Sequence, residues 1–369
     1  MKAGFGTASI TPVPPVYLAG FGARTEPANE VHSELEARAL HLSSGDTAMC
    51  LVVCDLLGMT PDHSTLIRDA VANELGLPRA NVILACTHTH SGPSLIAGSQ
   101  AIGWPIPDGY LDVAGTGCVA AASAARDASL DTSLRYVRAP LPDGFGFNRR
   151  GGDYDEPTFS VLHVVGAGLV ANMSIHPVLL GPQWLAVAPD WVGPFRRELE
   201  SVTEPTAIEL TGALGDINPT PPTGEPEETY EPWASSEQTA DYGRRLACVV
   251  ADAVPAAEPI EDTLRVLREE TFEVPVGGTG IAELYGRPTM DVELVEWAIG
   301  DVRVVSVPGE AFHALGREIS NARDDRVLLA GLSPWQGYLP YPYADGYEEG
   351  VSYGPAAVAA IRDALLTAP

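Results

Sequence analysis

The chain has 369 residues, with 22 Lys and Arg against 49 Asp and Glu, and its formal net charge is −27. Such a surface repels nucleic acids and anionic membranes, so neither is expected as a partner. Hydrophobic residues make up 45% of the chain and charged residues 19%, which excludes a disordered protein and provides for a substantial core.

The N-terminus carries no apolar signal core, and no apolar run reaches the roughly 20 residues that a membrane-spanning helix needs. The five cysteines are odd in number and are scattered along the chain. Buried free thiols in a reducing compartment account best for this pattern. The sequence therefore predicts a cytoplasmic protein.

The first clear elements form a strand–helix–strand unit. A continuous apolar run predicts a strand over residues 49–56, amphipathic spacing predicts a helix over 61–75, and a second apolar run predicts a strand over 81–86. An alanine-rich segment with helical spacing predicts another helix over 109–128. The β-α-β pattern is typical of parallel, buried strands in an α/β protein.

Strands and helices continue to alternate along the rest of the chain. A Gly-Ala-Gly turn between two apolar runs predicts a hairpin of residues 159–165 and 169–175. The remaining expected elements are helices over 190–200, 235–254, 309–322 and 355–366, and strands over 292–299, 302–307 and 326–332. Residues 219–232, rich in Pro and Glu, are expected to form a long loop. We therefore expect one α/β domain over residues 1–369, with mixed sheets and flanking helices.

The most informative segment, residues 85–93, reads ACTHTHSGP. Because side chains two apart on a strand share a face, His88 and His90 should leave the predicted strand side by side. Neutral imidazole is the commonest protein metal ligand, and strand-end loops carry much of the chemistry of α/β proteins. Hydrogen-bonded turn histidines are the alternative interpretation. The paired His-x-His pattern favours a metal or catalytic site.

Three other polar groups follow apolar runs in the same way. His176 ends a predicted strand, and Glu310 follows the apolar run 302–307 and lies in the first turn of the predicted helix. Tyr338 lies in a tyrosine-rich loop after the run 326–332. Helix capping by the carboxylate and simple packing of the tyrosines are the alternative interpretations.

In this order, the motifs resemble the neutral/alkaline (non-lysosomal) ceramidase family of zinc-dependent amide hydrolases. The most specific of them is the string THTHSGP at residues 87–93. The other matching motifs are GFGTASITP (4–12), GFG (20–22), EARAL (36–40), CDLLG (54–58), FNRR (147–150), IHP (175–177), GDINP (215–219), VPGE (307–310), GLS (331–333), GY (337–338) and YE (347–348). The resemblance extends over nearly the whole chain and implies the mixed α/β fold of that family's catalytic domain.

The resemblance also implies a set of site residues. The family binds zinc through the first His of THTH, a second strand-end His, the Glu of PGE and a Tyr, which fall here on His88, His176, Glu310 and Tyr338. Two imidazoles, a carboxylate and a phenolate are donors that suit zinc. The family residues that act on the substrate fall on His90, Arg149 and Tyr347. The spacing from Tyr338 to Tyr347 is shorter than in the family.

Two features depart from the family pattern. The ceramidases carry a serine, the proposed nucleophile, where this chain has Asn218, and a carboxamide is not a nucleophile. Water activated by zinc is then expected to attack the carbonyl, and Asn218 to donate a hydrogen bond to the oxyanion. The family's C-terminal immunoglobulin-like domain is also missing from this sequence, which argues against ceramide as the substrate.

The sequence therefore predicts a zinc-dependent hydrolase that cleaves an amide bond in a small soluble N-acyl compound. His90 is expected to carry the proton to the leaving amine, while Arg149, Tyr347 and Asn218 stabilise the oxyanion. An esterase, lactonase or acyl transferase on the same zinc site is one alternative, and a metal-binding homologue without activity is another. The oligomeric state stays open, a homo-oligomer included.

Overall fold

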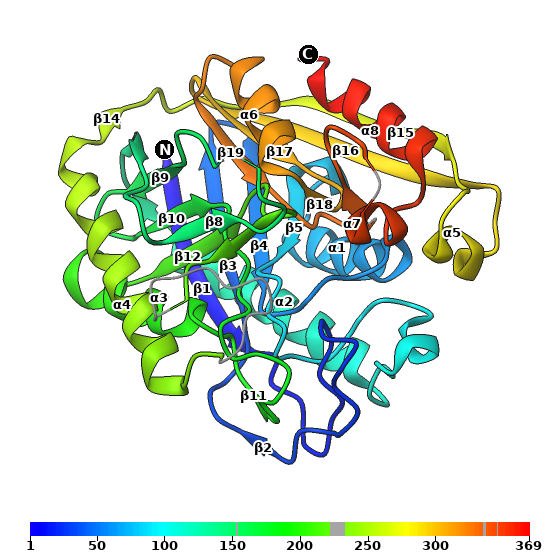
Figure 1. The fold of residues 1–369 in the computed structure, drawn as a ribbon. Coiled ribbons are helices and arrows are strands. Elements are labelled where there is room, and N and C mark those ends of the chain that lie inside the picture. Colours follow the sequence, from blue (N-terminus) through cyan, green and yellow to red (C-terminus); the bar gives the residue numbers. More distant parts are fainter. Residues whose placement is uncertain (153, 222–232, 335–336, 345) are drawn as a thin grey trace.

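The structure of the protein, a computed structural model, describes residues 1–152, 154–221, 233–334, 337–344 and 346–369 (Figure 1). Three mixed sheets with helices packed on them make up most of the fold, which confirms the expected α/β class. No helix in the described ranges is both long enough and apolar enough to cross a membrane. Most of the expected loop 219–232 lies outside the described residues.

The first sheet contains the predicted strand–helix–strand unit. Its elements are β1 (Lys2–Ser9), β3 (Glu36–Ser44), β4 (Thr47–Cys54), α1 (Pro61–Leu75), β5 (Val82–Cys86), α2 (Tyr110–Asp127) and β6 (Leu130–Asp131). The strand order is β5-β4-β3-β1-β6. β4 and β5 are parallel, and α1 connects them, whereas the other neighbours are antiparallel.

The second sheet is built around the predicted hairpin. Its elements are β7 (Leu134–Pro140), β9 (Thr158–Val164), β10 (Gly168–Met173), α3 (Val192–Val202), β12 (Ala207–Thr211), α4 (Ser236–Ala253) and β14 (Glu258–Pro259). The strand order is β12-β10-β9-β7-β14. β9 and β10 form the antiparallel hairpin, and β10 pairs in parallel with β12.

The third sheet holds the C-terminal part of the chain. Its elements are β15 (Leu264–Pro275), α5 (Gly280–Tyr285), β16 (Thr289–Ile299), β17 (Val302–Ser306), α6 (His313–Asn321), β19 (Val327–Ala330) and α8 (Pro355–Leu366). The strand order is β15-β16-β17-β19, with β17 and β19 parallel. The 12-residue strand β15, which the sequence analysis does not include, forms one edge of this sheet.

Short elements connect and border the three sheets. Three two-stranded pairs are β2 (Glu30–Val31) with β11 (Ala186–Val187), β8 (Gly146–Asn148) with β13 (Ile217–Pro219), and β18 (Glu310–Ala311) with β20 (Tyr338–Leu339). The short helices are η1 (Arg79–Asn81), η2 (Ser99–Ile102), η3 (Val254–Ala256) and α7 (Tyr347–Gly350).

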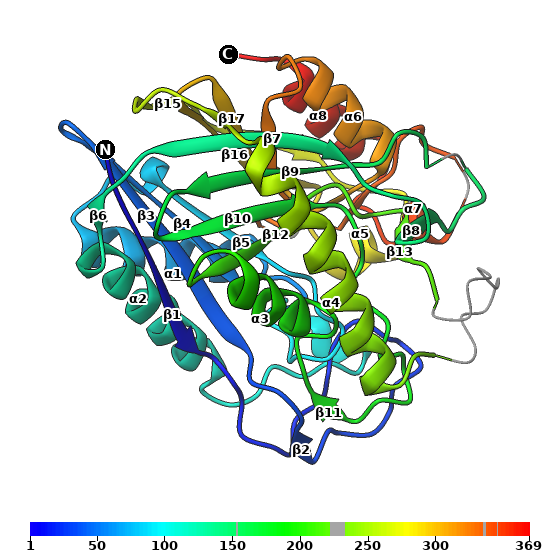
Figure 2. The same ribbon diagram turned by 90° about the vertical axis from the view of Figure 1, so that its left-hand side faces the viewer.

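Hydrophobic side chains form one core between the sheets and further cores beneath the helices. The central core joins all three main sheets and includes Phe5, Leu162 and Trp297. The opposite face of each sheet packs against a pair of helices: α1 with α2, α3 with α4, and α6 with α8 (Figure 2). Strands buried on both faces explain why so many of them appear in the sequence as continuous apolar runs.

The two glycines of the N-terminal strand β1 allow a helix to pack closely against it. A Cβ at Gly4 would lie 2.3 Å from the carbonyl oxygen of Ala125, and one at Gly6 would lie 2.2 Å from that of Ala121. Both carbonyls belong to α2, so the helix lies directly on the backbone of the strand. Glycine weakens the local preference for a strand, which is why sequence patterns alone do not reveal β1.

The expected helix over 309–322 begins later than its sequence predicts. Glu310 lies on the short strand β18, where its amide N–H donates to the Gly337 carbonyl at 3.0 Å. The amide of Phe312 likewise donates to the Leu339 carbonyl at 3.2 Å. Backbone pairing with β20 therefore holds this segment extended, and α6 begins only at His313. The expectation that Glu310 lies in the first turn of a helix is wrong.

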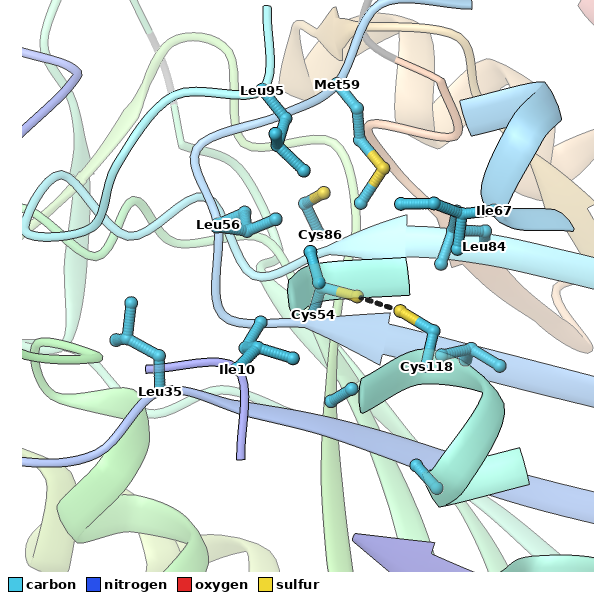
Figure 3. Packing of buried hydrophobic residues seen from close by; sticks show 14 of the residues in the cluster. Ile10, Leu35, Cys54, Leu56, Met59, Ile67, Leu84, Cys86, Leu95 and Cys118 are labelled. Atoms are coloured by element: carbon cyan, nitrogen blue, oxygen red, sulfur yellow. Dashed lines mark hydrogen bonds between the residues drawn. The ribbon is translucent and has the colours of Figure 1, made fainter. Parts of the chain in front are cut away.

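Four of the five cysteines are buried, and Cys248 is exposed. Figure 3 shows Cys54, Cys86 and Cys118 among the aliphatic side chains of the core beneath α1 and α2. The sulfur atoms of Cys54 and Cys118 are 3.3 Å apart and remain thiols. Burial raises the pKa of Cys86, which suits a core residue rather than a nucleophile.

The contact between α3 and α4 yields a first prediction, because Gly243 leaves no room for a side chain. A Cβ there would lie 2.5 Å from the Trp191 carbonyl oxygen and 2.9 Å from the Phe195 amide nitrogen. We expect Gly243→Ala to separate the helices and to lower the free energy of unfolding by about 1–3 kcal/mol, as overpacking does. Urea unfolding measures this difference.

The matched control is Gly115→Ala in α2. The nearest atom to a Cβ at Gly115 is a carbon of Ile67 at 3.7 Å, an ordinary contact distance. Alanine should therefore stabilise the protein there by up to about 1 kcal/mol through its helix propensity. A loss of stability at Gly115 equal to that at Gly243 would show that close packing of α3 on α4 is not the cause.

Candidate metal centre

Each main sheet contains one parallel pair of strands, and the carboxyl ends of the three pairs meet. The pairs are β4 with β5, β10 with β12, and β17 with β19. The hydroxyl of Thr211, the last residue of β12, donates to the Thr87 carbonyl at 3.1 Å, and the Gly331 amide donates to the Thr211 carbonyl at 2.8 Å. This edge is where open α/β sheets bind their ligands.

His88 lies two residues beyond β5 in an uncommon backbone conformation, with φ at 68°. Its amide N–H donates to the Leu56 carbonyl at 2.9 Å, and its imidazole Nδ1 lies 2.6 Å from the Leu57 carbonyl oxygen. Since a carbonyl can only accept, Nδ1 carries the hydrogen. Nε2 is then left as the atom that can bind a metal.

His176 is fixed in the same manner in the loop after β10. Its amide N–H and its Nδ1 lie 3.1 and 3.0 Å from the carbonyl oxygen of Ile217. The Trp191 indole N–H donates to the His176 carbonyl at 3.0 Å. Burial lowers the pKa of His176 to about 4, so its imidazole is neutral and Nε2 is an acceptor.

Glu310 places one carboxylate oxygen between the two histidines. Its Oε2 lies 3.2 Å from His88 Nε2 and 3.4 Å from His176 Nε2, and all three side chains are buried. Burial alone would raise the pKa of Glu310, but His88 and His176 outweigh that effect and hold the pKa well below its ordinary value. A carboxylate oxygen and two imidazole nitrogens therefore converge on one point.

His90 joins this group from the same loop as His88. Its ring centroid lies 4.9 Å from that of His88 and 5.9 Å from that of His176, and one ligand atom from each of the three lies within 4.8 Å of the others. Burial, reinforced by His88, lowers the pKa of His90 well below its ordinary value. Within the described part of the chain, neither of its ring nitrogens has a hydrogen-bond partner. His90 is thus a neutral imidazole beside the other two.

Tyr338 is held by Arg149. The Arg149 guanidinium donates to the phenol oxygen at 3.1 Å and to the Gly215 carbonyl at 2.8 Å. Burial raises the pKa of Tyr338 well above its ordinary value, although Arg149 opposes the shift. Tyr338 pairs through its backbone with Glu310, so both residues reach the site on adjacent strands.

The other two expected residues lie around Arg149. Asn218 is buried on β13, and its Oδ1 lies 3.4 Å from the Arg149 guanidinium. Tyr347 begins α7, is 69% exposed, and its ring centroid is 6.2 Å from that of Tyr338. The seven residues that the resemblance implies, together with Asn218, are therefore linked by contacts into one region.

The donor set at Glu310 fits a bound cation. The Nδ1 atoms of His88 and His176 contact backbone carbonyls, so in the neutral form of each ring Nε2 is an acceptor that faces the Glu310 carboxylate, which is an acceptor as well. Acceptors that converge in a buried space repel one another unless a positive charge lies among them. Imidazole and carboxylate are common ligands of Zn²⁺.

Glu348 is a site residue that the sequence analysis does not assign. Glu348 is 5% exposed, and its carboxylate accepts from Arg149 at 3.0 Å and from Arg150 at 2.6 Å. Arg149 is therefore oriented from two sides, by Tyr338 and by Glu348. In the sequence, two glutamates follow Tyr347 and two arginines follow Asn148. These paired opposite charges are the signal from which the contact could have been proposed.

No protein-family model matches the chain, and no curated protein matches it at a significant level. Solved structures do match. The neutral ceramidase from Pseudomonas aeruginosa superposes with a TM-score of 0.83 at 19% identity, over 99% of this chain and 73% of that one. A ceramidase complexed with C2 superposes with a TM-score of 0.82 at 16% identity, over 99% of this chain and 74% of that one. The protein therefore has the fold of the neutral ceramidases, as its motifs predict.

A buried carboxylic acid, Glu209 on β12, supports the segment before His88. Its Oε2 lies 3.0 Å from the Thr211 hydroxyl, which also contacts the Thr87 carbonyl at 3.1 Å. A hydroxyl has one hydrogen and a carbonyl can only accept, so a protonated Glu209 satisfies both contacts. Burial raises the pKa of Glu209 from 4.5 to about 8, in agreement with this assignment.

This arrangement predicts a pH-dependent stability. The folded pKa of about 8 exceeds the unfolded value of 4.5, so the stabilisation is complete below pH 4.5 and is lost as the pH rises towards 8. Glu209→Gln cannot ionise and should become more stable relative to the wild type across this window. Urea unfolding of both proteins at several pH values measures the difference. The control Glu258→Gln, at an exposed carboxylate, should show the same pH dependence of stability as the wild type. A difference in unfolding free energy between Glu209→Gln and the wild type that stays constant with pH would contradict the prediction.

Proposed function

We propose that the protein is a zinc-dependent hydrolase that cleaves an amide bond in a small N-acyl compound. The observation that carries this proposal is the position of Glu310 Oε2, 3.2 and 3.4 Å from two imidazole nitrogens whose partner nitrogens are fixed by backbone carbonyls. The likeness in fold to neutral ceramidases supports it.

The zinc ion would be held by His88, His176, Glu310 and Tyr338. Zinc bound there supplies a Lewis acid that polarises a carbonyl group and brings the pKa of water to about 7. The backbone carbonyls of Leu57 and Ile217, which receive the Nδ1 hydrogens, keep both imidazoles turned towards the ion.

His90 is assigned to proton transfer. It lies within ligand reach of His88 and His176, but Glu310 already occupies the position between those two side chains. A neutral imidazole whose ring nitrogens make no hydrogen bond within the described chain can accept a proton from water and return it to the leaving amine.

Arg149, Tyr347 and Asn218 are assigned to the carbonyl oxygen. The Arg149 guanidinium is a permanent charge held by Tyr338 and Glu348, so it is oriented before substrate binds. The exposed phenol of Tyr347 and the carboxamide of Asn218 lie beside it and add neutral donors. The negative charge that develops on the oxygen would be stabilised by these three groups.

An open groove of about 820 Å³ gives a place for one part of the substrate. It is lined by Trp184, Trp233, Leu180 and neighbouring uncharged residues, and no charged side chain of the described chain lines it. Phe21 connects the groove to the site, with ring centroids 5.5 Å from Trp233 and 4.8 Å from His90. This lining favours an uncharged group on the substrate.

The metal assignment predicts different outcomes for the two neighbouring histidines. His88→Ala should abolish bound zinc, because it removes a ligand. His90→Ala should keep one zinc ion per chain but lose rate by roughly 10²–10⁴, the usual effect of a general acid–base group. Elemental analysis gives the zinc content, and a panel of short- and long-chain N-acyl substrates gives the rate.

The matched control is His41→Ala, since His41 is as buried as His90 but lies on β3 beside Ser129. It should keep both zinc and activity. Full zinc occupancy in His88→Ala would refute the proposed ligand set. Loss of zinc from His90→Ala would make His90 a ligand rather than a base.

The replacement of the family serine by Asn218 predicts hydrolysis without an acyl-enzyme. Asn218→Ala should lower the rate by on the order of 10²–10³, the effect of removing one oxyanion donor. Rapid-quench mass spectrometry during turnover should show only unmodified protein. A protein species carrying the acyl mass, formed and lost at the catalytic rate, would refute direct attack by water.

A further inference from the structure

Arg24 lies outside the described machinery, yet it contacts the backbone of His90. Arg24 is 5% exposed, and its guanidinium donates to the His90 carbonyl at 2.8 Å and to the Gly181 carbonyl at 3.0 Å. The same group lies 3.4 and 3.3 Å from the carbonyl oxygens of Leu18 and Ala19. One buried cation therefore joins three loops that are distant in sequence.

The surroundings of Arg24 make this contact rigid. Its guanidinium lies 5.1 Å from the ring centroid of Phe21, and the buried carboxylate of Asp190 supplies the compensating charge. Asp190 in turn accepts the amide hydrogens of Leu179, Leu180 and Trp191 at 3.2, 3.0 and 2.7 Å. The loop that follows His176 is thus fastened from two sides, by Asp190 and by Arg24.

The imidazole of His90 depends on this backbone contact for its position. No described residue hydrogen-bonds to either ring nitrogen. The ring instead packs against Phe21, with centroids 4.8 Å apart, and against Gly20, where a Cβ would lie only 2.3 Å from His90 Cγ. Packing and backbone contacts therefore take the place of the hydrogen bonds that orient His88 and His176.

We infer that Arg24 is a positioning residue for His90, which it holds in place by binding the carbonyl of His90 and linking it to the loop that follows His176. The inference rests on the proposed role of His90 in proton transfer. A bidentate guanidinium suits this task because it reaches two carbonyls at once, whereas the ammonium of a lysine is a single point charge.

The test uses the full chain without added metal and diethyl pyrocarbonate, which acylates accessible neutral imidazoles. Peptide mass spectrometry follows the modification of His90 and of His41, each 8% exposed. Arg24→Met should accelerate modification of His90 by on the order of tenfold, because a charge-assisted hydrogen bond to its backbone is lost. His41 should react as in the wild type. Arg24→Lys keeps a positively charged donor, so its rate of His90 modification should lie between those of the wild type and of Arg24→Met. This variant serves as the test if Arg24→Met does not fold.

Arg68→Met is the matched control. Arg68 is also 5% exposed and also binds backbone carbonyls, those of Val82 at 3.1 Å and Arg79 at 3.2 Å, at the other end of β5. Its loss should leave the reactivity of His90 unchanged. An unaltered His90 in Arg24→Met would overturn the inference, and so would equal acceleration in Arg68→Met, because that would indicate general loosening of the protein.

A kinetic experiment becomes possible once a substrate that the enzyme turns over has been found. Arg24→Met should lower kcat in the wild-type background and have no further effect in the His90→Ala background, since it acts through that side chain. An equal loss in both backgrounds would overturn the inference.

Zinc uptake by the wild type is measured separately with zinc alone. A protein that takes up no zinc contradicts the proposed function and leaves the reactivity result on Arg24 intact.

Discussion

A buried ion pair joins the first sheet to α3 and holds together the two layers that carry the histidines of the site. Asp55, which follows β4, accepts from the Arg196 guanidinium at 2.8 and 2.6 Å. The same carboxylate accepts the Glu36 amide at 2.9 Å and lies 3.3 Å from the Thr87 hydroxyl, next to His88. Removing one partner of such a pair leaves a buried charge uncompensated, which costs about 3–5 kcal/mol. The sheet that carries the first two histidines therefore cannot shift independently of the layer that carries His176.

Two contrasting environments meet at the point that this scaffold defines. On one side, the buried imidazoles of His90 and His176 are neutral and lie among aromatic and backbone groups. On the other side, Arg149 and Arg150 form charged contacts with the buried carboxylates of Glu348 and Glu349. A polar bond placed between the two sides would experience a directed field. In the proposed hydrolase, this field would distinguish the two ends of a bound group before the reaction begins.

Sequence patterns were sufficient where the structure rests on contiguous residues. The THTHSGP string located His88 and His90, and hydrophobic periodicity located the parallel pair β4 and β5 with its helix. They failed where a distant segment decides the local structure. Glu310 is extended because β20 pairs with it. Gly6 lies in a strand although glycine disfavours strands, because α2 packs so closely on it that no side chain fits. Arg24 contacts its partners through carbonyl groups, which every residue has, so no motif marks its role.

The groups of the site come from almost the whole length of the chain, and this has a consequence for its biosynthesis. His88 and His90 leave the ribosome first, His176 follows, and Glu310 comes much later. Tyr338 joins only when β20 pairs with β18. A nascent chain therefore displays imidazoles alone for a long period, and such ligands bind copper and nickel as readily as zinc. In the proposed metal centre, discrimination between metal ions would therefore arise only when the last strands have docked.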